Sequence, residues 1–116
     1  MLVKDEVGLR ELIEEHLSKL GHAVKAFDSA ETALLYFAPN KFDVLVIDYH
    51  LSGPSTGIDF IKDIRKLDPR IGVVITTADS QPYVSQQCDG LHVWSVIADI
   101  DNFDLLAEKI NEAYEF

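Results

Sequence analysis

Two carboxylates and a hydroxyl stand at the ends of three apolar runs, where they could bind a metal ion or a phosphate group. Asp5 and Asp48 each follow such a run, and Thr77 closes a third. Each could simply be a polar residue that ends a strand, but three of them on successive strands make a shared site the better interpretation. If the strands lie side by side, two carboxylates and one hydroxyl converge at the carboxyl edge of a sheet.

An alternation of five strands and five helices must position these residues. The run that Asp48 ends is rich in β-branched residues, which indicates a strand buried on both faces. Strands are predicted at residues 1–4, 23–27, 44–48, 71–76 and 93–97. Apolar residues at helical spacing predict helices over about 9–20, 30–37, 58–67, from about 82, and over about 102–114.

Two of these helices carry further predictions about capping and burial. Ser29 is placed to cap the second helix. Inward-facing residues are predicted in the second helix and in the last one, namely Ala30, Ala33, Leu34, Phe37, Phe103, Leu106, Ile110 and Ala113.

Strict alternation of strands and helices implies the α/β class, with a parallel sheet covered by helices on both faces. Right-handed crossovers limit the topology strongly, and the predicted version is a doubly wound (βα)5, flavodoxin-like domain with the strand order 2-1-3-4-5. This order brings the first and third strands together, and therefore places Asp5 beside Asp48.

Composition narrows the functional class. The 116 residues suit one domain, with 47% hydrophobic residues and a net charge of -10. Such an acidic chain is a poor match for nucleic acid. We expect no membrane span, and no signal peptide because Asp5 and Glu6 interrupt the first apolar residues. Cys88 is the only cysteine, which fits a reducing compartment and predicts a cytoplasmic protein.

The order and spacing of several short motifs resemble the receiver domain of two-component response regulators, over residues 1–116. The segment from Leu2 to Leu12 looks like the acidic-pair motif and first helix of that family. Asp48 matches the phosphoryl-accepting aspartate, and Thr77 with Ala78 matches the switch threonine and its small neighbour. The loop after Asp48 is similar to the family's loop and is one residue longer.

This resemblance implies a phosphoryl acceptor rather than an enzyme, with at most self-catalysed phosphoryl transfer and autodephosphorylation. Asp48 would accept the group from a histidine kinase or a phosphotransfer protein. Mg²⁺ would be held by Asp5, Asp48 and the backbone carbonyl of His50, since Mg²⁺ prefers hard oxygen ligands. Thr77 would hydrogen-bond a phosphoryl oxygen and bias a two-state surface.

Two positions depart from the family pattern. Lys4 stands where the first acid of the pair belongs, and Ala98 aligns with the family's lysine at the end of the fifth strand. An ammonium near Mg²⁺ would repel the metal. The Lys4 side chain could swing its charge into water, or it could point at Asp48 and serve as the cation of the site.

These departures leave two functions open. One is a working receiver that is phosphorylated on Asp48. The other is a pseudo-receiver that acts as a phosphorylation-independent protein-interaction module. An unrelated hydrolase is disfavoured, because His50, Asp48 and Ser55 share one short loop and no G-x-S-x-G motif is present.

Tyr83 and Trp94 are the candidate interface residues. The helix from about residue 82, the strand 93–97 and the last helix would form the output surface of a receiver. An exposed Trp94 on that surface would be a natural anchor for a homodimer or another partner, and Tyr83 could join it.

Overall fold

The computed structural model describes residues 1–51, 56–78, 81–98 and 103–115, and it contains a five-stranded parallel sheet. The strands are β1 (Leu2–Val3), β2 (Ala26–Phe27), β3 (Val44–Asp48), β4 (Gly72–Thr77) and β5 (Ser95–Ala98). Their order is β2-β1-β3-β4-β5. This confirms the predicted fold class and strand order, and it places β1 against β3 at the centre of the sheet.

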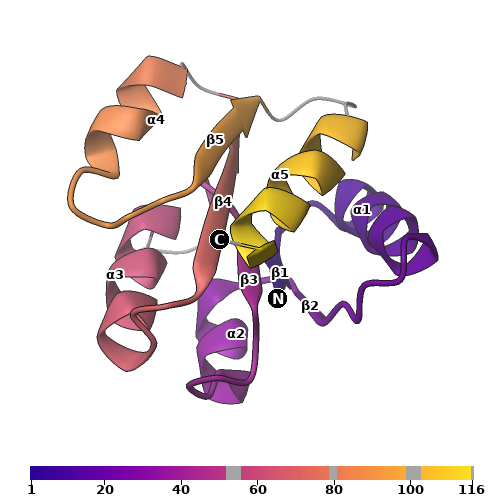
Figure 1. The fold of residues 1–116 in the computed structure, drawn as a ribbon, viewed down its shortest axis with the longest axis horizontal. Helices are drawn as coiled ribbons and strands as arrows, with labels where there is room; N and C mark the ends of the chain where they lie inside the picture. Colours follow the sequence, from indigo (N-terminus) through magenta and orange to yellow (C-terminus); the bar gives the residue numbers. More distant parts are fainter. Residues whose placement is uncertain (52–55, 79–80, 99–102, 116) are drawn as a thin grey trace.

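Five helices cover the two faces of this sheet (Figure 1). They are α1 (Val7–Lys19), α2 (Ala30–Tyr36), α3 (Gly57–Leu67), α4 (Gln81–Gln87) and α5 (Phe103–Glu115). Helices α1 and α5 pack on one face, while α2, α3 and α4 lie on the other. The arrangement is the doubly wound one that alternating elements predict.

The core divides into two clusters because side chains alternate between the two faces of each strand. Val3, Ile47 and Ile75 belong to the cluster under α2, α3 and α4. Leu2 and Val46 belong to the cluster under α1 and α5. This alternation determines the face of the sheet on which each side chain at a strand end lies.

Helix starts follow local hydrogen bonding, as the sequence indicated for α2. The Ser29 hydroxyl accepts a hydrogen bond from the backbone N–H of Thr32 at 3.1 Å, which confirms Ser29 as the cap. The inward prediction holds for Ala30 and Ala33 but is wrong for Leu34, which is 40% exposed. Helix α2 has only seven residues, so its apolar stripe covers a narrow arc and Leu34 falls outside it.

Some boundaries differ from the prediction. Strand β2 is confined to two residues, and β5 begins at Ser95 rather than at residue 93. The predicted loop residues 52–55, which include Ser55, lie outside the described residues. Among the helices that the structure describes, none is long and apolar enough to cross a membrane.

Candidate functional site

The candidate site is a row of three polar side chains across β1, β3 and β4. Leu2 pairs with Val46 in register, so that two residues further along Lys4 reaches the level of Asp48. Asp48 in turn pairs with Thr76. Because side chains alternate along each strand, Lys4, Asp48 and Thr76 share the face of Leu2 and Val46. All three therefore meet at the carboxyl end of the sheet, on the side of α1 and α5.

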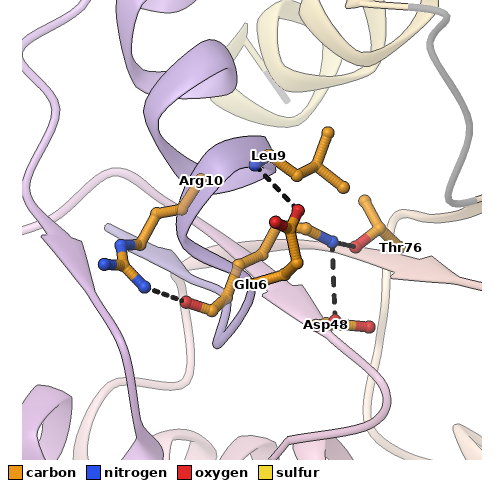
Figure 2. A network of polar contacts seen from close by, with 6 residues as sticks. Glu6, Leu9, Arg10, Asp48 and Thr76 are labelled. Carbon is orange, nitrogen blue, oxygen red and sulfur yellow. Dashed lines mark hydrogen bonds and ion pairs between the residues drawn. The ribbon is translucent and has the colours of Figure 1, made fainter.

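The Lys4 ammonium joins the other two members of this row. Lys4 Nζ donates a hydrogen bond to Thr76 Oγ1 at 3.1 Å and lies 3.5 Å from Asp48 Oδ2, the two contacts that meet at one nitrogen in Figure 2. Lys4 is 0% exposed and Asp48 is 8% exposed. The ion pair is therefore largely shielded from water, which strengthens the attraction between its charges. Of the two positions expected for Lys4, the structure adopts the one that points at Asp48.

The backbone of Lys4 is held on both sides. Its N–H donates to the carbonyl of Phe27 at 3.1 Å, and its carbonyl accepts a hydrogen bond from Arg10 Nη1 at 2.9 Å (Figure 2). These bonds connect the end of β1 to β2 and to α1. They fix the point from which the Lys4 side chain enters the site.

The first turn of α1 forms a second border of the site. Glu6 caps the helix, because its carboxylate accepts hydrogen bonds from the N–H groups of Gly8 at 3.1 Å and Leu9 at 2.8 Å. Asp5 precedes Glu6 in the loop between β1 and α1 and is partly buried. Glu6 thus has a capping role. The role of Asp5 as a metal ligand stays a prediction.

The start of α3 lies directly against the backbone of Asp48. The N–H of Gly57 donates to the carbonyl of Tyr49 at 2.9 Å. A Cβ atom at Gly57 would collide with the backbone carbonyl oxygen of Asp48. Glycine is therefore required here by close approach of two backbones. His50 is exposed and its ring packs edge-on against Tyr49, with 4.8 Å between centroids.

Thr77 and Ala98 end the two neighbouring strands. Thr77 is buried and pairs in register with Ala98, which is the last residue of β5. The structure thus brings the backbone of the predicted switch threonine next to Ala98, the residue that the resemblance aligns with the family's lysine. The role of Thr77 toward a phosphoryl group stays a prediction.

The two candidate interface residues lie apart from this row. Tyr83 is 51% exposed, and its ring contacts Tyr49 edge-on with 6.5 Å between centroids. Trp94 is 38% exposed, and its Nε1 donates to Glu112 Oε1 at 3.1 Å. The N–H of Trp94 donates to the carbonyl of Val73 at 2.8 Å, three residues before Thr76 on β4. Tyr83 is therefore linked to the loop after Asp48, and Trp94 is linked to α5 and β4.

Sequence reasoning missed Thr76, which binds Lys4. It selected Thr77, the last polar residue of the strand, and treated Thr76 as part of the run. If the predicted strands are aligned at their carboxyl ends, Lys4, Asp48 and Thr76 stand side by side. The alternation of side chains along each strand then places Thr76 on the same face as Lys4 and Asp48.

This arrangement is poorly suited to a divalent cation on the face of the sheet that Lys4 occupies. Lys4 brings a positive charge to within 3.5 Å of the Asp48 carboxylate. In the described ranges no three His, Cys, Asp or Glu side chains come together as metal ligands. With the Lys4 ammonium in place, the residues present do not fit a strong Mg²⁺ site.

Residues 1–110 match the family model of the response regulator receiver domain. The sensory/regulatory protein RpfC of Xanthomonas campestris pv. campestris is 30% identical over 94 residues, which are 77% of this chain and 13% of that protein. The response regulator protein FleR of Pseudomonas aeruginosa is 35% identical over 78 residues, 67% of this chain and 16% of its own length. The chain thus spans less than a fifth of either relative.

Solved structures show the same fold. The non-phosphorylated HemR receiver domain of Leptospira biflexa superimposes with a TM-score of 0.90 at 22% identity, over 99% of this chain and 92% of that one. The response regulator protein TrrA of Thermotoga maritima, solved in complex with Mg²⁺ and BeF, gives a TM-score of 0.83 at 25% identity, over 97% and 95% of the two chains.

Proposed function

Because this chain belongs to the response regulator receiver domain family of two-component systems, we propose that it accepts a phosphoryl group on Asp48. The family is a phosphoryl acceptor rather than a classical enzyme. The matched relatives carry the names of a sensory protein and a response regulator, which favours phosphorylation over the phosphorylation-independent alternative.

The donor in this proposal is a phosphohistidine on a histidine kinase or a phosphotransfer protein. The P–N bond of the donor breaks as a P–O bond forms to a carboxylate oxygen of Asp48, and the released imidazole takes up a proton. A carboxylate is a weak nucleophile, so the reaction depends on positioning and charge neutralisation. Thr77 would then bind a phosphoryl oxygen.

The observation that carries the proposal is the placement of Asp48. It lies at the carboxyl end of a central strand, 8% exposed, with the hydroxyl of Thr76 and the ammonium of Lys4 on the same side of the sheet. In open parallel sheets this edge is where ligands bind. The backbone around Asp48 is fixed by the close approach of Gly57.

Binding of Mg²⁺ by this chain stays a prediction, with Asp5, Asp48 and the backbone carbonyl of His50 as the ligands that the resemblance implies. No step of the proposal depends on it. The cytoplasmic location is likewise part of the proposal.

Incubation with phosphoramidate, which contains a P–N bond, tests the acceptor directly by intact mass. The wild type should gain the mass of one phosphoryl group, and Asp48→Asn should gain none. Asp43→Asn is the matched control, because Asp43 precedes the opposite end of the same strand. A well-folded wild type that gains no mass would instead support the interaction module.

The surface of α4, β5 and α5 is the proposed output surface, with Tyr83 on α4 and Trp94, which directly precedes β5, as its candidate aromatic anchors. Trp94 is anchored to Glu112 on α5, which holds its ring in one orientation for a homodimer or another partner. A Trp94→Ala variant should weaken self-association in sedimentation experiments. Unchanged association would remove Trp94 from the interface.

A further inference from the structure

We infer that Lys4 is the resident cation of the Asp48 site, and that Mg²⁺ must compete with its ammonium for the same carboxylate. This inference rests on the proposed function only in taking Asp48 as the centre of the site. It explains how a receiver fold can keep its acceptor while it departs from the family pattern at Lys4 and Ala98.

The first support is geometric. A lysine at the end of a strand usually extends its charge into water, but Lys4 is completely buried. Its Nζ lies between Asp48 Oδ2 and Thr76 Oγ1, on the face toward α1 and α5. A divalent ion that bound Asp48 on this face would lie within a few ångströms of a fixed positive charge.

The second support is the way the Lys4 backbone is held. Phe27 and Arg10 bond the N–H and the carbonyl of Lys4. To let a metal ion reach Asp48 on this face, the ammonium must give up its contacts with Asp48 and Thr76. The stem would have to move while its backbone stays fixed.

The third support is the charge of the lysine itself. Burial of an ammonium is costly, and an apolar residue of similar size would pack at least as well. A lysine at this position is therefore explained by its contacts with Asp48 and Thr76 rather than by packing. The family's usual source of positive charge, at the position of Ala98, is absent from this sequence. Lys4 places a charge in the site from β1 instead of β5.

A Mg²⁺ titration followed by amide NMR tests the inference without any phosphorylation. Lys4→Asp exchanges the ammonium for a ligand oxygen, and should bind Mg²⁺ at least about a hundredfold more tightly than the wild type. Lys4→Met removes the charge without adding a ligand and should fall between the two. Its apolar side chain keeps the test valid if Lys4→Asp does not fold.

Lys19→Asp is the matched control for total charge. Lys19 lies in the last turn of α1, exposed and paired with Glu15, and is about 20 Å along the helix from the site. This variant should titrate like the wild type. Wild-type affinity for Mg²⁺ equal to that of Lys4→Met would overturn the inference. Failure of Asp48 to accept a phosphoryl group would leave these affinities unchanged and would count only against the proposed function.

Discussion

Arg65 and Lys4 are two positively charged side chains that make different kinds of contact in this fold. Arg65, near the end of α3, donates hydrogen bonds to four backbone carbonyls. They belong to Leu91 at 2.8 Å, His92 at 2.9 Å, Pro69 at 3.2 Å and Ile71 at 2.6 Å. Lys4 instead contacts the side chains of Asp48 and Thr76.

This difference assigns the two side chains different roles, Arg65 in the stability of the fold and Lys4 in the chemistry of the site. The rigid guanidinium of Arg65 ties α3 to the segments that enter β4 and β5, so its charge is committed to the backbone. Burial lowers the pKa of Arg65 from its ordinary value, and nearby Asp68 opposes that shift. The charge of Lys4 is directed at side chains that bear the proposed function. Loss of Arg65 should damage the fold, whereas loss of Lys4 should change the site.

The largest effect is expected from Arg65→Met. It leaves four carbonyls without their donor and should lower the free energy of unfolding by about 3 kcal/mol, measured by urea denaturation. Arg65→Lys keeps the charge but loses the planar fork, and should give a smaller loss. A loss below about 1 kcal/mol for Arg65→Met would contradict its role as a structural cation.

A smaller loss of about 2 kcal/mol is expected from Gly57→Ala. The new methyl group would meet the backbone of Asp48 and Tyr49, which would move the acceptor relative to Lys4. Gly8→Ala is the control, because its methyl group would meet only the end of the Glu6 side chain, at 3.2 Å. It should leave stability unchanged or raise it by up to about 1 kcal/mol. Equal losses in the two variants would disprove the steric explanation.

The smallest change in stability is expected from the double variant Lys4→Met/Asp48→Asn, within about 1 kcal/mol of the wild type. Removal of both charges of a buried ion pair is often neutral, whereas removal of one partner would leave the other charge buried and unpaired. The same urea denaturation measures it. A loss as large as that of Arg65→Met would make Lys4 a structural cation too, and the comparison would fail.

The sequence predicted the fold because periodicity specifies it strongly. The apolar run before Asp48 predicts β3. The alternation of elements predicts a parallel sheet, and right-handed crossovers limit its possible strand orders. Leu34 shows the limit of this prediction. Helical spacing identifies an apolar face but does not tell which of its residues the sheet covers. The contact between Lys4 and Thr76 was harder still to predict. It depends on the register of three strands, and a shift of one residue would turn each side chain to the other face.

The most direct test of the account is phosphorylation by phosphoramidate in the presence of a chelator, followed by intact mass. If Lys4 supplies the positive charge at Asp48, the wild type should gain a phosphoryl group with the chelator at a rate within about threefold of that with Mg²⁺. Under the chelator Lys4→Met should be at least about tenfold slower, because this variant lacks the ammonium that contacts the acceptor. Phosphorylation that requires Mg²⁺, and whose rate is the same in the wild type and in Lys4→Met, would contradict the account.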